Sequence, residues 1–158
     1  MNSLERIKEE FNDMLANPFP NIGCTVGLEN YDNYYEWKLA FFPPKDSLYR
    51  GGFFNVKLLF PENYPFSAPQ IIFLTPIYHF NANPKKSKDL PLGYASIKVT
   101  EFWKPGTTAR ELITQFYSIF YSHNPDSPFG LDKALEYKEN RPLFELKAKY
   151  FTKNMLIH

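Results

Sequence analysis

The stretch that decides the fold is Phe54-Asn-Val-Lys-Leu-Leu-Phe60, in which every second residue is a large apolar one. A period of two is typical of a half-buried β-strand, because successive side chains point to opposite faces of a sheet. The same alternation runs through residues 35–41, and a short apolar run follows at 71–74. Pro43-Pro44, Gly51-Gly52 and the proline-rich segment 61–69 separate these runs as turns. The region from Thr25 to Leu74 therefore predicts a four-stranded antiparallel meander sheet.

Helical patterns lie on both sides of this region. Residues 4–16 carry apolar side chains at spacings of three and four, with Asn2 or Ser3 as the N-cap and Asn17-Pro18 as the end. The spacing resumes from Ala109 to Phe120, a short helix is expected at 131–137, and Pro142 is well placed in the first turn of a last helix. We expect the buried side of that last helix to carry four apolar residues: Leu143, Leu146, Tyr150 and Phe151.

Residues 75–106 show neither period, and an irregular stretch of this length inside a compact domain is usually functional. Its aromatic content favours a packed, ordered loop. The order of elements predicts an α+β fold: an N-terminal helix, the meander sheet, a long ordered loop and then the C-terminal helices. We expect one domain over residues 1–158.

The composition excludes several classes of function. The 18 Lys and Arg residues nearly balance the 17 Asp and Glu residues, which argues against a nucleic-acid binder. No apolar run approaches the roughly 18–20 residues of a membrane span, so no membrane partner is expected. The lone Cys24 cannot form an internal disulfide and fits a reducing compartment. Cysteine and histidine lack ligand spacing, so we expect neither metal nor cofactor. We expect a monomer in the cytoplasm, the nucleus or both.

Several spaced motifs occur in a fixed order. They are the segment from Tyr49 to Ile71 with Tyr64-Pro65-Phe66 inside it, Thr75-Pro-Ile-Tyr-His-Phe-Asn81, Trp103-Lys-Pro-Gly106 and Asn124-Pro-Asp-Ser-Pro128. In this order they resemble the ubiquitin-conjugating enzyme family over essentially the whole chain. The resemblance implies the fold of ubiquitin-conjugating enzymes. It also implies that the protein, together with a ligase, transfers ubiquitin or a ubiquitin-like modifier from an activating enzyme to a substrate lysine.

The family holds the modifier as a thioester on a cysteine, a nucleophile near neutral pH. Counting from Gly93 puts Ser96 at that position, whereas counting back from Trp103 gives Ala95 and would bury Lys98. We prefer Ser96. The resemblance implies that Asn81 steadies the oxyanion and that His79 holds the loop. It also implies that Asp126 and Ser127 border the site, with Ser127 where members often carry an acid.

The serine places the activity of this form in question. A serine needs an adjacent base, and no Gly-x-Ser-x-Gly motif or spaced triad supplies one. We therefore expect deficient transfer, from an active enzyme whose cysteine was replaced or from a naturally inactive relative. A binding module of the related RWD type, or an adaptor without chemistry, is the alternative.

The remaining expectations concern partners. By the resemblance, Arg6 and Lys8 dock the activating enzyme, and Phe66 and Pro105 contact the ligase. The segment 83–89 carries three lysines beside the expected site, where they could steer an acidic partner.

Overall fold

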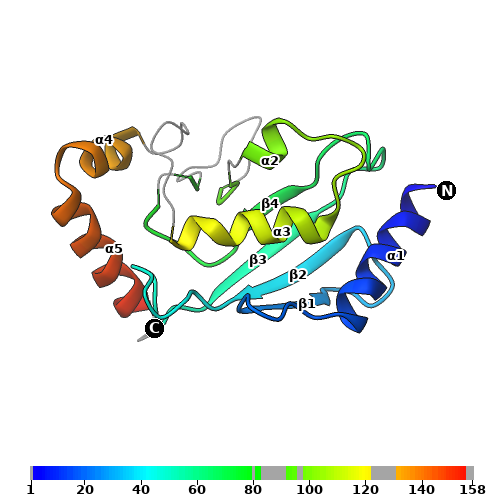
Figure 1. Cartoon of the computed structure of the whole chain (residues 1–158), viewed down its shortest axis with the longest axis horizontal. Helices are drawn as coiled ribbons and strands as arrows, with labels where there is room; N and C mark the ends of the chain where they lie inside the picture. The colour runs from blue at the N-terminus through cyan, green and yellow to red at the C-terminus, as the bar shows by residue number, and fades with distance from the viewer. Residues whose placement is uncertain (1, 80, 83–91, 96–97, 122–130, 156–158) are drawn as a thin grey trace.

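The computed structural model describes residues 2–79, 81–82, 92–95, 98–121 and 131–155. In chain order the elements are α1 (Ser3–Ala16), β1 (Cys24–Leu28), β2 (Glu36–Phe41), β3 (Phe54–Leu59), β4 (Gln70–Phe73), α2 (Lys98–Glu101), α3 (Ala109–Tyr117), the 3-10 turn η1 (Ser118–Phe120), α4 (Leu131–Glu139) and α5 (Arg141–Met155). The strands form one antiparallel sheet in the order β1-β2-β3-β4, which confirms the predicted meander. Figure 1 shows α3 along this sheet, with α1 beyond one end and α4 and α5 beyond the other.

The first helix begins and ends where its sequence predicts. The amide of Glu5 donates to the side chain of Asn2 at 2.8 Å, so Asn2 is the N-cap. The helix stops at Ala16, since the residue before a proline disfavours helical dihedrals. Its buried positions are Ile7, Phe11 and Met14, which turn one face of α1 toward the core.

The two central strands supply the floor of the core. Residues 37, 39 and 41 of β2 and 54, 56 and 58 of β3 are fully buried, and they face each other in register, with Leu39 opposite Val56. Burying each such side chain contributes roughly 1.5–3 kcal/mol. The helix α3 covers this floor, and Phe41 packs against Phe116 with ring centroids 5.1 Å apart. On the other face, Lys57 pairs with Glu36 at 3.3 Å.

The predicted buried face of the last helix is wrong. In α5 the buried residues are Phe144, Ala148 and Thr152, whereas Leu146 is 65% exposed and Tyr150 is 70% exposed. The sequence offers apolar residues on two sides of this helix, and contacts with distant segments, such as that of Phe144 with Tyr78, decide between them. A Cβ added to Gly52 would lie 2.9 Å from the methyl group of Thr152, so α5 approaches the 49–53 turn too closely for a large residue.

The long loop contains one helix that the sequence did not predict. The four residues of α2 lie inside 75–106, and a single turn is too short to create a helical period. The helix at 109–120 is also less regular than expected, because its last turn, η1, is 3-10. None of the described helices has the length and apolar character needed to cross a membrane.

Candidate functional site

The expected site is built on the outer edge of β4, the last strand of the sheet. The segment 93–95 runs beside this strand: Phe73 donates its amide to the carbonyl of Gly93 at 2.8 Å, and Ala95 donates to Ile71 at 2.8 Å. Gly93 is required at this point. Its φ is +83°, and an added Cβ would lie 2.2 Å from the carbonyl oxygen of Phe73. These contacts fix the chain immediately before residue 96.

The segment carrying Asn81 joins the same edge. Ala82 and Ala95 form an antiparallel bridge. Asn81 is next to Ala82 in sequence, and position 96 is next to Ala95, so the bridge brings the two segments together. Ala95 is 1% exposed and belongs to the hydrophobic core. A buried methyl group is a poor place for a nucleophile. Residue 96 as the reactive position stays a prediction.

His79 holds this segment from inside the protein. The amide of Asn81 donates to Nδ1 of His79 at 3.0 Å, so Nδ1 carries no proton and Nε2 donates to the carbonyl of Ile119 at 3.0 Å. The ring is fully buried and stacks on Tyr49 at 5.7 Å. Since both ring nitrogens are engaged in hydrogen bonds, His79 is committed to holding the loop and η1 together in this structure.

Tyr49 and Ser47 extend this anchor. Tyr49 donates its hydroxyl to the carbonyl of Tyr78 at 2.7 Å, and Ser47 donates its hydroxyl to the carbonyl of Phe120. Burial raises the pKa of Tyr49 well above its ordinary value, so the hydroxyl stays protonated as this donor role requires. The sequence motifs did not predict the hydrogen-bonding role of either residue. The position of Tyr49 at the start of the long motif was the available signal.

Several of the expected site residues are outside the described part of the chain. These are Ser96, Asp126 and Ser127, together with the lysine-rich segment 83–89. Their roles stay predictions. Asn81 is described: it is 4% exposed, and its backbone takes part in the contact with His79.

The only cysteine of the chain lies far from this edge. Cys24 is on β1, at the opposite side of the four-stranded sheet from β4. Three strand spacings of about 4.8 Å separate the two edge strands by roughly 14 Å. Burial raises the pKa of the Cys24 thiol to about 12, which keeps it protonated near neutral pH.

The expected ligase-facing residues lie on two neighbouring loops. Phe66 is 75% exposed and follows a cis Tyr64–Pro65 peptide. Trp103 donates its indole N–H to the carbonyl of Pro65 at 2.7 Å, which ties the loop of Phe66 to the loop of Pro105. The structure therefore brings Phe66 and Pro105 to one region of the surface.

Arg6 joins the same region from α1. It donates to the carbonyls of Pro105 at 2.9 Å and Thr107 at 3.0 Å, and it pairs with Glu10 at 3.3 Å. Its guanidinium is thus largely engaged within the protein. Lys8 is exposed on the same helix, with its ammonium 5.2 Å from the ring centroid of Tyr34. Docking of the activating enzyme by Arg6 and Lys8 stays a prediction.

Glu10 was not predicted from the sequence as part of this arrangement. Its carboxylate accepts hydrogen bonds from Arg6, the Tyr64 hydroxyl and the amide of Ala109, the last at 2.6 Å. It thereby connects α1, the loop before Phe66 and the first turn of α3. The spacing of four between Arg6 and Glu10 indicated only a helical ion pair. The other two partners are 54 and 99 residues away in sequence.

Within the described ranges, His, Cys, Asp and Glu side chains form no group that could hold a metal ion.

Comparisons with known proteins agree with the sequence motifs. The family model described as "Ubiquitin-conjugating enzyme" matches residues 6–152. The chain is 33% identical over 147 residues to ubiquitin-conjugating enzyme E2 14 of Schizosaccharomyces pombe, covering 93% of this chain and 90% of the relative. It is 30% identical over 151 residues to ubiquitin-conjugating enzyme E2 14 of Arabidopsis thaliana, covering 90% and 88%. It is also 30% identical over 154 residues to E2 15 of S. pombe, covering 93% and 91%.

Proposed function

Because the chain belongs to the ubiquitin-conjugating enzyme family, we propose that it works with ubiquitin or a ubiquitin-like modifier, an activating enzyme and a ligase, and that residue 96 is its reactive position. One observation carries the proposal. The bridge between Ala82 and Ala95 brings the segment of Asn81 against the chain that leads into residue 96. An amide donor beside the reacting carbonyl is what stabilisation of an oxyanion needs.

The chemistry of the family requires a thiolate at this position. Its sulfur attacks the carbonyl carbon of the activated modifier, the thiolate of the activating enzyme leaves, and a new thioester forms. The amine of a substrate lysine then attacks this thioester, and the sulfur leaves as the amide forms. A serine needs a base to begin the first step, and both ring nitrogens of His79 are occupied by hydrogen bonds. We therefore propose that the form with Ser96 is deficient in transfer.

The remaining thiol does not replace the missing one. Cys24 lies across the sheet from the expected site, and its raised pKa leaves little thiolate at neutral pH. Any thioester activity should thus depend on a cysteine introduced at residue 96.

The experiment compares the native chain, Ser96→Cys, and Ser96→Cys combined with Cys24→Ser. Each is incubated with activating enzyme, ATP and ubiquitin, and then separated with and without reductant. We expect a reducible adduct with both variants that carry a cysteine at 96, because the thiol there is the acceptor. The native chain should form no reducible adduct, and any ester on Ser96 should resist reductant and be cleaved by alkali.

Two outcomes would contradict the proposal. One is the absence of an adduct from Ser96→Cys with ubiquitin and with each available ubiquitin-like modifier. The other is an adduct that disappears with Cys24→Ser, which would move the reactive position to β1. A second change, Ala95→Cys, tests the alternative numbering and should give no adduct, since Ala95 is 1% exposed.

A second candidate function is that of an adaptor without transfer chemistry. Two features favour it. A serine occupies the expected reactive position, and the loop of Pro65 and Phe66 is ordered for binding, with Phe66 75% exposed and the carbonyl of Pro65 bonded to Trp103. An adaptor would bind a ligase through Phe66 whether or not residue 96 is a cysteine. If Ser96→Cys fails to charge but Phe66→Ala weakens binding to a ligase, the adaptor is supported and the transfer function is rejected.

A further inference from the structure

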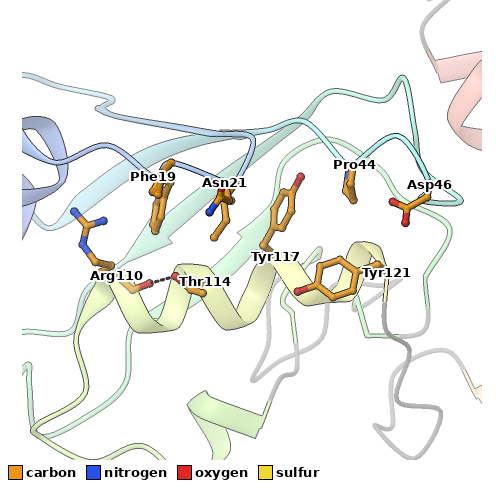
Figure 2. A pocket seen from close by; sticks show the side chains of 10 residues that line it. Phe19, Asn21, Pro44, Asp46, Arg110, Thr114, Tyr117 and Tyr121 are labelled. Carbon is orange, nitrogen blue, oxygen red and sulfur yellow. Dashed lines mark hydrogen bonds between the residues drawn. The ribbon is translucent and has the colours of Figure 1, made fainter.

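A wide hollow lies along α3, away from the β4 edge. It has a volume of about 810 Å³ and is formed by three segments of the chain. Residues 19–22 form one wall, and Pro44 and Asp46 close one end. The floor consists of Arg110, Thr114 and Tyr117 on α3, with Tyr121 directly after η1. Figure 2 shows Arg110 at one end of this hollow and Asp46 with Tyr121 at the other.

Aromatic and proline residues make up half of its lining. They are Phe19, Pro20, Pro44, Tyr117 and Tyr121. Tyr121 is 58% exposed, so its ring is available to a ligand. Tyr117 is buried, and its hydroxyl donates to the carbonyl of Phe42 at 2.7 Å, which fixes the floor. Rigid rings and pyrrolidines of this kind give a surface that binds extended apolar chain at low entropic cost.

The arginine end of the hollow is already satisfied. Arg110 pairs with Asp13 at 3.2 Å, donates to the carbonyls of Asp13 and Asn17, and lies 5.1 Å above the ring of Phe19. Thr114 donates its hydroxyl to the carbonyl of Arg110 at 2.8 Å. This end therefore offers the stacked face of a guanidinium rather than an open positive charge.

The rest of the hollow has unused hydrogen-bonding capacity. Among the residues that the structure describes, the side chains of Asn21, Asp46 and Tyr121 have no hydrogen-bond or ion-pair partner. Asn21 and Tyr121 supply donors, and Asp46 supplies a negative charge. The neighbouring Lys45 is exposed but does not line the hollow.

From these contacts we infer that the hollow binds an extended proline-rich peptide with one basic residue, placed so that the basic side chain meets Asp46. A proline-rich backbone has carbonyl acceptors but few N–H donors, which matches the donors of Asn21 and Tyr121. The proline rings of the peptide pack against the aromatic rings of the hollow, and the carboxylate of Asp46 attracts the basic side chain of the peptide. The distance from Arg110 to Tyr121 along the helix is roughly 17 Å, enough for five or six residues of polyproline II.

The test titrates a fluorescein-labelled ten-residue peptide, with Pro-x-x-Pro spacing and one terminal arginine, with the full chain, and follows fluorescence anisotropy. We expect a dissociation constant on the order of 10–100 μM. Tyr121→Ala should weaken binding about fivefold through the lost ring contact. Asp46→Asn should weaken it about threefold, and the loss should shrink at high salt.

Two residues that are consecutive in sequence and lie outside the hollow provide matched controls. Tyr31 is 90% exposed and Asp32 is exposed, so Tyr31→Ala and Asp32→Asn remove the same groups elsewhere on the surface. Both should bind the peptide like the unaltered chain. A peptide with glutamine in place of arginine should bind the unaltered chain and Asp46→Asn equally.

The inference is overturned by the absence of saturable binding up to about 1 mM protein. It is also overturned if Tyr121→Ala and Asp46→Asn bind as well as their controls, because the peptide is then held elsewhere. Peptide binding is measured on the unloaded chain and does not depend on residue 96. If the peptide does not bind, the expected charging of Ser96→Cys is unaffected. If Ser96→Cys is not charged, the expected peptide binding to the hollow is unaffected.

Discussion

Replacing Glu10 tests whether its carboxylate holds α1, the loop before Phe66 and the start of α3 together. In the native chain its two oxygens accept from the amide of Ala109, the hydroxyl of Tyr64 and the guanidinium of Arg6, and the side chain is only 14% exposed. Burial, followed by the hydrogen bond to Glu10, raises the pKa of Tyr64 above its ordinary value. The tyrosine thus remains a donor, and all three partners of the carboxylate are donors.

The substitution Glu10→Gln keeps the shape but replaces one acceptor oxygen with an NH₂ donor. At least one buried donor then loses its acceptor, at a cost of about 1–3 kcal/mol. Loss of the ion pair with Arg6, whose side chain is 25% exposed, adds up to about 1 kcal/mol. We expect a total destabilisation of about 1–4 kcal/mol, or a fall in Tm of roughly 2–16 °C for a chain of this size.

The assay is urea denaturation followed by tryptophan fluorescence, because Trp37 is in the core and Trp103 contacts the affected loop. Glu9→Gln is the control: it makes the same change at the adjacent exposed position and should shift the free energy of unfolding by no more than about 0.5 kcal/mol. If the two variants are equally stable, Glu10 does not connect α1 to these loops as argued.

Three further predictions concern the β4 edge and the lone thiol. Gly93→Ala should destabilise by about 2 kcal/mol or more, because it strains a positive φ and collides with Phe73, whereas Gly106→Ala, with open space around it, should cost under about 1 kcal/mol in the same denaturation assay. His79→Ala should cost about 2–4 kcal/mol, since it orphans the amide of Asn81 and the carbonyl of Ile119; stability equal to that of Lys8→Ala would disprove the anchor. Cys24 should react with a thiol reagent at pH 8 about a thousandfold more slowly in the folded chain than in denaturant, as expected for a pKa raised from 9.0 to about 12. Because this pKa is raised on folding, the associated stability is present below pH 9 and is lost as the pH rises toward 12; comparable rates in both states would contradict the burial of this thiol.

Local patterns predicted the elements that depend on neighbouring residues. The N-cap of α1, expected at Asn2 or Ser3 and found at Asn2, and the end of α1 before Pro18 follow from nearby side chains and prolines. The alternation in β2 and β3 specified both the strands and their buried face. Family resemblance added the expected positions of His79 and Asn81, and the structure then brought Asn81 beside the segment leading to residue 96.

The errors have a common physical origin. The buried face of α5 was misassigned because Leu146 and Tyr150 form as regular a stripe as Phe144 and Ala148. Only contacts with distant segments, such as that of Phe144 with Tyr78 and that of Thr152 with Gly52, select the buried side. The single turn of α2 was missed because four residues create no period.

The sequence by itself therefore determined the strands, the principal helices, the family and the absence of a cysteine at the expected reactive position, since each is recorded in local order or in motif spacing. Only the tertiary structure decided that Glu10 binds groups 54 and 99 residues away, that both nitrogens of His79 are engaged, and that a hollow lies along α3. Those features arise from contacts between distant segments, and the energy of such contacts depends on three-dimensional distances that no local pattern encodes.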